Sequence, residues 1–222
     1  MAADPHAGQP VREAGAPLGR AQAAVVLLHG RGDSATGILQ LADVLAQPDV
    51  AFLAPDAAGR TWYPYSFLAP LALNEPHLSS ALRLVEAVAT RAADVIGVER
   101  TVLMGFSQGA CLATEYAARN ARRYGAVVGL SGGLIGNGER HGVDPPADKT
   151  FDYGGDLAGT PVFLGCSDVD PHIPVERVHQ TAEAFSGLGA DVDERIYPGM
   201  GHTITDDEVR AVRGLLAGLL RG

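Results

Sequence analysis

Short runs of β-branched and aliphatic residues alternate along this chain with segments of helical periodicity. The runs occupy residues 24–28, 50–54, 101–104, 126–130, 161–165 and 192–197. Strands that are joined through helices run parallel, and a parallel sheet needs a cover on both faces. We therefore expect an α/β fold with a mainly parallel central sheet and helices on both of its faces.

Two helices have the clearest patterns. Apolar residues between positions 78 and 96 recur every three or four residues, and Pro76 suits the first turn of that helix. Near the end of the chain, Thr205 and Glu208 have the spacing of a capping box, and residues 209–219 carry one apolar face. Two segments, 59–74 and 132–159, lack such patterns and are expected to be loops over one edge of the sheet.

The length and composition fit one globular unit. The chain has 222 residues, of which 46% are hydrophobic and 19% charged, enough for one well-buried core. Because no shift in composition divides it, residues 21–222 are expected to form a single domain. Residues 1–20, which include His6, are expected to form a tail or a short edge segment. The sequence leaves open whether the chain forms a homodimer.

The charge and the apolar runs exclude several classes of partner. A formal net charge of -9 leaves no basic face for nucleic acid. The N-terminal residues lack the pattern of a signal peptide, and the purest apolar run, 23–28, is too short for a membrane helix. We therefore expect a cytoplasmic protein without stable membrane insertion. Cys111 and Cys166 lie in apolar segments and are interpreted as buried thiols.

The motif G-x-S-x-G occurs twice, at residues 105–109 and 129–133. In this motif a sharp turn from strand to helix exposes a serine oxygen above the sheet. Both copies follow an expected strand, but only Ser107 is followed by residues that favour a helix. The glycine-rich stretch after Ser131 disfavours one. Ser107 is therefore the predicted nucleophile, and Ser131 is interpreted as a serine at a strand end.

The next turns along the chain carry an acid and a histidine. Asp168 and Asp170 both follow the run 161–165, and their spacing alone does not choose between them. His202 follows the run 192–197 and is the predicted base, with His172 as a weaker candidate. Asp168, Asp170 and His172 also permit a metal-binding interpretation, because carboxylates and imidazoles bind cations, but no second cluster of ligands accompanies them.

The stretch HGRGDSATG, residues 29–37, permits three interpretations. Residues 31–34 spell an adhesion tetrapeptide, which would need an extracellular loop. Gly30-x-Gly32-x-x-Ala35 spells a dinucleotide-binding turn, with Asp56 near the position of a ribose-binding acid. That interpretation leaves the nucleophile and its partners unexplained. In the third, the residues after His29 supply half of an oxyanion hole.

Taken together, four motifs resemble the phospholipase/carboxylesterase family of small α/β-hydrolases, which includes the acyl-protein thioesterases. They are His-Gly-x-Gly-Asp at 29–33, Gly-Phe-Ser-Gln-Gly at 105–109, Asp-Pro-x-Ile-Pro at 170–174 and Gly-Met-Gly-His at 199–202. The resemblance implies an α/β-hydrolase fold and a catalytic triad of Ser107, Asp170 and His202. It also implies an oxyanion hole made by the backbone N–H groups of Arg31 and Gln108. Since Gln108 begins a helix, where free N–H groups attract negative charge, the physics agrees.

We therefore expect a serine hydrolase that cleaves carboxylic esters or thioesters through an acyl-enzyme and, within that class, a carboxylesterase for a small-molecule substrate. No metal or organic cofactor is implied. The alternatives are a dinucleotide-binding oxidoreductase and a non-catalytic binding protein on a hydrolase scaffold. The residues expected to line an apolar substrate pocket are Trp62, Tyr63, Phe67, Leu68 and Phe106.

Overall fold

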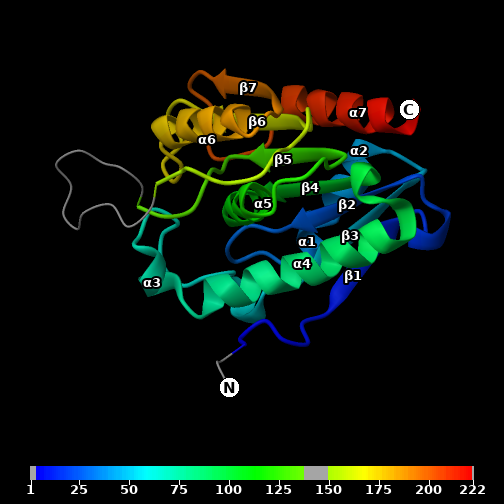
Figure 1. Cartoon of the computed structure of the whole chain (residues 1–222), viewed down its shortest axis with the longest axis horizontal. Coiled ribbons are helices and arrows are strands. Elements are labelled where there is room, and N and C mark those ends of the chain that lie inside the picture. The colour runs from blue at the N-terminus through cyan, green and yellow to red at the C-terminus, as the bar shows by residue number, and fades with distance from the viewer. Residues whose placement is uncertain (1–3, 138–149, 222) are drawn as a thin grey trace.

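A seven-stranded sheet crosses the computed structural model, which describes residues 4–137 and 150–221. Its strands lie in the order β1-β3-β2-β4-β5-β6-β7 (Figure 1). Strands β2 to β7 are parallel, and β1 pairs antiparallel with β3. The mainly parallel sheet predicted from the sequence is confirmed. The strands are β1 Val11–Gly15, β2 Ala23–Leu28, β3 Val50–Pro55, β4 Thr101–Phe106, β5 Ala126–Leu130, β6 Pro161–Ser167 and β7 Asp191–Tyr197.

Helices cover both faces of the sheet, as expected. One face packs against α4 (His77–Ile96), α5 (Gln108–Arg119) and α6 (Val175–Gly187). The other packs against α1 (Ala35–Ile38), α2 (Gln40–Leu45) and α7 (Asp206–Arg221). Alternate residues of β2 serve the two cores, since successive side chains of a strand point to opposite faces. The short elements are α3 Leu71–Asn74 and the 3₁₀ turns Leu18–Arg20, Ala58–Arg60 and Val98–Arg100.

The first described residues belong to the folded unit. Strand β1 forms one edge of the sheet, and the His6 side chain is buried. The His6 backbone N–H donates to Ser80 Oγ at 2.8 Å, and its ring lies 2.9 Å from the Trp62 carbonyl oxygen. The expectation that His6 lies in a tail is therefore wrong. Of the two expectations for residues 1–20, the short edge segment agrees with β1; VREAG was not among the expected strands because an edge strand with one polar face and a terminal glycine lacks an apolar run.

The capping box before α7 is confirmed. The Thr205 backbone N–H donates to Glu208 Oε2 at 2.7 Å, and the Glu208 backbone N–H donates to Thr205 Oγ1 at 3.2 Å. Cys111 and Cys166 are buried free thiols, as expected. In the part of the chain that the structure describes, no helix is both long and apolar enough to span a bilayer. Of the two irregular segments, 59–74 is fully described, whereas residues 138–149, including His141, lie outside the described ranges.

The turn from β4 into α5 is unusually tight. Ser107 sits there at φ 55° and ψ -121°, a backbone conformation that costs energy for any residue with a side chain. A Cβ atom on Gly109 would lie 2.1 Å from the Leu28 carbonyl oxygen, and one on Gly105 would lie 2.3 Å from the Gly109 carbonyl. Both glycines are therefore required because backbone atoms occupy the space of a side chain.

This close packing predicts a large difference between two glycine substitutions. Gly109→Ala is expected to lower the free energy of unfolding by about 2 kcal/mol or more, because α5 must move away from β2. Gly214→Ala, in α7 where no atom lies within 4 Å of the added carbon, is the matched control. It is expected to raise that free energy by about 0.5 kcal/mol through helix propensity. Urea unfolding monitored by circular dichroism measures both, and equal effects would contradict the packing argument.

Candidate active site

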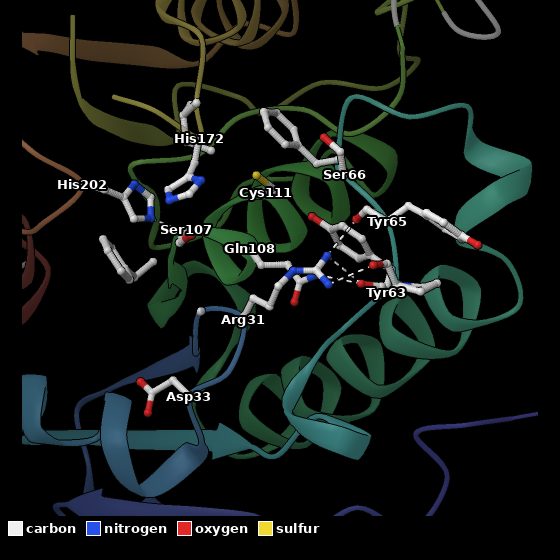
Figure 2. A pocket seen from close by; sticks show the side chains of 15 residues that line it. Arg31, Asp33, Tyr63, Tyr65, Ser66, Ser107, Gln108, Cys111, His172 and His202 are labelled. Carbon is white, nitrogen blue, oxygen red and sulfur yellow. Dashed lines mark hydrogen bonds between the residues drawn. The ribbon is translucent and has the colours of Figure 1, made fainter. Parts of the chain in front are cut away.

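Ser107, His202 and Asp170 lie in one hydrogen-bonded row. They come from three different turns, after β4, β7 and β6, whose carboxyl ends share one edge of the sheet. His202 Nε2 lies 2.8 Å from Ser107 Oγ, and His202 Nδ1 lies 2.7 Å from Asp170 Oδ2. Figure 2 shows the His202 ring beside Ser107. An ionised carboxylate only accepts hydrogen bonds, so Nδ1 carries the proton and Nε2 is free to accept one from the serine.

Asp170 is held as an ion by several donors. Its side chain is fully buried, and Oδ1 accepts the backbone N–H groups of His172 and Ile173 at 2.8 and 3.1 Å. Burial raises the pKa of Asp170, but the hydrogen bonds from His202 and from these two N–H groups outweigh it, so the pKa is lowered overall. Asp168 instead accepts the Gly199 N–H at 2.7 Å. The two candidate acids therefore separate: Asp170 contacts the histidine, and Asp168 binds the loop that carries it.

Two aromatic rings flank His202. The Phe106 ring lies tilted at 5.0 Å between centroids, and the His172 ring meets it edge-on at 4.9 Å. These contacts restrict the rotation of His202. His172, the weaker candidate for the base, thus packs against His202, and it is His202 that lies within hydrogen-bond distance of Ser107.

The second G-x-S-x-G motif has a similar backbone but different surroundings. Ser131 follows β5 with φ 50°, so both serines occupy strained turns at strand ends. Ser131 is completely buried, and among the described residues its hydroxyl has no nitrogen or oxygen partner. Ser107 lines a cavity and has His202 beside it. The interpretation of Ser131 as a strand-end serine agrees with this placement.

Two backbone N–H groups near Ser107 are available to a ligand. Gln108 is the first residue of α5, so its N–H has no acceptor within the helix. Within the described residues, neither this group nor the Arg31 N–H donates to a backbone carbonyl. The Gly30 carbonyl, on the opposite side of the Arg31 peptide, is held by His29 Nδ1 at 2.7 Å and by the Asp33 N–H at 3.2 Å. These bonds fix the plane of that peptide.

The glycines around Arg31 act differently from each other. Gly32 has φ 81°, so it provides a conformation that other residues adopt rarely. A Cβ on Gly30 would make only ordinary contacts at 3.5 Å with Phe106 and Ser107. The position of the Arg31 amide therefore depends on the backbone conformation at Gly32 more than on space at Gly30.

The side chains of Arg31 and Gln108 hold the aromatic loop. The Arg31 guanidinium donates to the carbonyl oxygens of Tyr63, Pro64 and Tyr65 at 2.9, 2.9 and 2.7 Å (Figure 2). Gln108 Oε1 accepts the Trp62 N–H at 2.9 Å, and Nε2 donates to the Tyr63 carbonyl at 2.8 Å. The residues that offer backbone donors to the site thus also fix its wall. The adhesion interpretation is not supported, because the Arg31 head is engaged within the chain.

A cavity of about 540 Å³ opens beside Ser107. Tyr63, Phe67 and Phe106 line it, in agreement with the sequence, whereas Trp62 and Leu68 do not. Trp62 is fully buried, and its indole N–H donates to the His29 carbonyl at 2.8 Å. Leu68 packs against the hydrophobic core. The lining residues are Gly30, Arg31, Asp33, Tyr63, Pro64, Tyr65, Ser66, Phe67, Phe106, Ser107, Gln108, Cys111, His172, Ile173 and His202.

Sequence reasoning missed two of the apolar residues in this lining. Cys111 lies four residues after Ser107 on α5, and residues with that spacing share a helix face. Ile173 lies three residues after Asp170, in the segment that folds back over the row. The spacing to Ser107 could have indicated Cys111. The position of Ile173 depends on the turn that Asp170 itself caps.

The dinucleotide-binding interpretation is wrong. The helix after Gly30-x-Gly32-x-x-Ala35 has only four residues, α1. Asp56 Oδ1 accepts the Ala35 N–H at 2.7 Å, so this carboxylate caps the helix where a ribose would be expected. The comparisons below likewise match the chain to an ester-hydrolase family.

Buried imidazoles support the same region. The Ala57 N–H donates to His29 Nε2 at 3.1 Å, so the ring is neutral, with its proton on Nδ1 facing the Gly30 carbonyl. The Ala58 N–H donates to His6 Nδ1 at 3.0 Å in the same manner. Burial lowers the pKa of both histidines. Both rings therefore act as neutral connectors between segments.

Sequence comparisons agree with the motifs. A sequence profile described as phospholipase/carboxylesterase matches residues 12–219. Acyl-protein thioesterase 1 of Gibberella zeae is 34% identical over 118 residues, 53% of this chain and 47% of that protein, so the chain matches about half of its length. Acyl-protein thioesterase 1 of Kluyveromyces lactis is 27% identical over 218 residues, 89% of this chain and 92% of that protein.

A solved structure is also similar throughout. The crystal structure of a phospholipase/carboxylesterase from Dyadobacter fermentans is 41% identical in sequence, with a TM-score of 0.86. The match covers 95% of this chain and 97% of that one.

The neutral histidines predict a stability that falls in acid. Unfolded histidines titrate near pH 6.5, whereas His6 and His29 bind protons only at lower pH in the folded chain, so the unfolded state binds more protons in between. The free energy of unfolding should therefore decrease as the pH falls from about 7 to about 5. Urea unfolding across this range measures it, and His29→Gln should show a shallower dependence. An identical slope in that variant would contradict the assignment.

Proposed function

The chain belongs to the phospholipase/carboxylesterase family, whose members cleave esters, and from this premise we propose that it hydrolyses carboxylic esters through an acyl-enzyme on Ser107. It has the α/β-hydrolase fold that the motifs implied. The observation that carries the proposal is the row of Ser107, His202 and Asp170, with spacings of 2.8 and 2.7 Å. This geometry gives a serine hydroxyl a base, and the base a partner that fixes its tautomer.

Acylation begins with proton transfer. His202 Nε2 takes the Ser107 proton as the serine oxygen attacks the acyl carbonyl, and Asp170 stabilises the imidazolium that forms. The tetrahedral intermediate carries a negative oxygen, which the N–H groups of Arg31 and Gln108 bind. His202 then donates its proton to the leaving alcohol or thiol, and Ser107 keeps the acyl group.

Deacylation repeats the sequence with water. His202 removes a proton from the water, which attacks the acyl carbonyl on Ser107, and the same two N–H groups bind the second oxyanion. The proton returns to Ser107 as the carboxylic acid leaves. The positive end of α5 favours each negative intermediate, because Gln108 lies at its first turn.

Within ester hydrolysis we propose carboxylesterase activity on small acyl groups. The Dyadobacter fermentans protein, described as a phospholipase/carboxylesterase, has a higher identity, 41%, than the two thioesterases above, at 34% and 27%. The cavity, of about 540 Å³, is bordered by Tyr63, Phe67 and Phe106, which suits an aromatic or short acyl group. Cleavage of acyl thioesters, which the names of the two curated relatives suggest, is the second candidate.

A matched pair of serine variants tests the nucleophile. A fluorophosphonate probe should label Ser107, and Ser107→Ala should abolish labelling and reduce ester hydrolysis by roughly 10⁴-fold or more, because the covalent step is lost. Ser131→Ala, in the other G-x-S-x-G motif, should keep both. Intact-mass spectrometry and a nitrophenyl ester assay measure the two effects. Labelling that persists in Ser107→Ala, or disappears in Ser131→Ala, would overturn the assignment.

A substrate panel tests the finer class. Nitrophenyl esters from acetate to palmitate, assayed beside thioesters of the same acids, should give the highest kcat/KM at short oxygen esters, because aromatic residues border the cavity beside Ser107. Steady-state rates at several substrate concentrations separate kcat from KM. A maximum at a long-chain acyl thioester would instead favour the thioesterase candidate.

A further inference from the structure

The hydroxyl of Tyr63 is buried in the cavity wall without an ordinary hydrogen-bond partner. The residue is 1% exposed, and among the described residues no nitrogen or oxygen lies within hydrogen-bond geometry of its Oη. The Cys111 thiol interacts with it, but a thiol is a weak partner. An unpaired buried hydroxyl normally destabilises a protein, so its presence in a cavity wall points to a partner that arrives with a ligand.

The rest of Tyr63 is fixed firmly. Its carbonyl oxygen accepts three hydrogen bonds, from Arg31 Nη2 at 2.9 Å, Gln108 Nε2 at 2.8 Å and Thr61 Oγ1 at 3.0 Å. The next residue but one, Tyr65, is held by Asn74 Oδ1, which accepts its N–H at 2.9 Å. These bonds fix the backbone from which the Tyr63 side chain extends, and the ring itself is buried. In Figure 2 the Tyr63 ring is directed towards Cys111, whereas the Tyr65 ring projects away from the cavity.

Helix α5 relates the Tyr63 hydroxyl to Ser107, because Cys111 on this helix interacts with the hydroxyl. Cys111, beside the Tyr63 hydroxyl, lies one helical turn beyond the nucleophile, a rise of about 6 Å along the axis. Both residues line the same cavity. A ligand atom that meets the Tyr63 hydroxyl is thus separated from the reacting carbonyl by a short chain of atoms.

The groups around the Tyr63 hydroxyl determine which kind of ligand atom can bind to it. Burial, with a contribution from Cys111, raises the pKa of Tyr63 well above its usual value, so the phenol stays neutral. Burial likewise raises the pKa of Cys111 to about 12, so the thiol is neutral too. A neutral phenol beside a neutral thiol, Phe67 and Ile173 suits an uncharged oxygen better than an ion.

We propose that Tyr63 is a specificity-determining residue that donates a hydrogen bond to an uncharged oxygen of the substrate, a ketone, ether or hydroxyl near the scissile ester. The preferred substrates are therefore esters whose cavity-bound part is oxygenated, and plain alkyl esters are poorer. This inference rests on the proposed ester hydrolysis at Ser107. A buried site that leaves its polar group unpaired discriminates strongly against the analogue that lacks the partner.

Isosteric ester pairs test the proposal. Nitrophenyl methoxyacetate is compared with the butyrate, and nitrophenyl levulinate with the isocaproate; for the alcohol side, methoxypropyl butyrate is compared with pentyl butyrate. Each pair exchanges an oxygen for carbon at nearly constant shape. The oxygenated esters differ from the alkyl esters in intrinsic reactivity as well, so the measured quantity is the ratio of kcat/KM within a pair, compared between the wild type and Tyr63→Phe. In at least one pair this ratio should be about fivefold higher in the wild type than in Tyr63→Phe.

Two controls separate recognition from structure. Tyr197→Phe removes a tyrosine hydroxyl from β7, on a residue that does not line the cavity, and should keep the wild-type ratio. The melting temperature of Tyr63→Phe should be equal to or above that of the wild type. Among the described residues no nitrogen or oxygen is hydrogen-bonded to this hydroxyl, so its removal leaves no such group unpaired. A lower melting temperature would show a structural partner and overturn the proposal.

The outcomes also distinguish a failure of the role of Tyr63 from a failure of the proposed ester hydrolysis at Ser107. Absence of hydrolysis in the wild type, together with unlabelled Ser107, would remove the proposed function itself. Hydrolysis with wild-type labelling but equal oxygenated-to-alkyl ratios in the wild type and Tyr63→Phe, for every pair, would overturn the role of Tyr63 alone.

Discussion

The contact between α5 and the end of β2 is the constraint on which the site depends. Gly109 brings the helix so near that a side chain there would overlap the Leu28 carbonyl. This approach brings the start of α5 close to the loop that follows β2, so that Arg31 and Gln108, from distant parts of the chain, both line the cavity beside Ser107. The strained backbone at Ser107 is tolerated because β4 and α5 are anchored on both sides of it.

A second set of contacts connects the aromatic loop of the cavity wall with Arg31 and Gln108. Arg31 and Gln108 present backbone N–H groups on one side and grip the aromatic loop with their side chains on the other. The orientation of the Arg31 peptide in turn depends on the neutral His29 ring. Movement of the cavity wall would therefore shift the two backbone N–H groups that we propose as the oxyanion hole.

The sequence predicted those elements whose causes are local. The parallel strands β2 to β6 are largely buried on both faces and so appear as apolar runs, and the capping box before α7 needs only Thr205 and Glu208. Strand β1 was missed because its stability comes from pairing with β3. The residue pattern alone did not decide whether Asp168 or Asp170 is the partner of His202. The two acids differ in what their side chains contact, since Asp170 reaches His202 and Asp168 reaches the Gly199 N–H.

The cavity wall shows the same limit more sharply. Trp62 and Tyr63 are neighbours in the sequence with similar aromatic character, and both are buried in the core, yet only Tyr63 also borders the cavity. The difference is set by hydrogen bonds from Gln108 and Arg31, far away in the chain, and no local pattern encodes it. Cys111 was within reach of prediction, because helical spacing from Ser107 places it on the same side.

The edge strand β1 has a consequence for the order of assembly. Residues 4–15 are synthesised before all of their partners: β1 pairs with β3, and the segment around His6 bonds to Trp62 and Ser80. On a ribosome β1 stays unpaired until β3, about forty residues further along the chain, has emerged, and the contact of His6 waits for Ser80, since non-local contacts close late. The edge strand β1 is thus synthesised first but joins the sheet only after the inner strands β2 and β3 have been made.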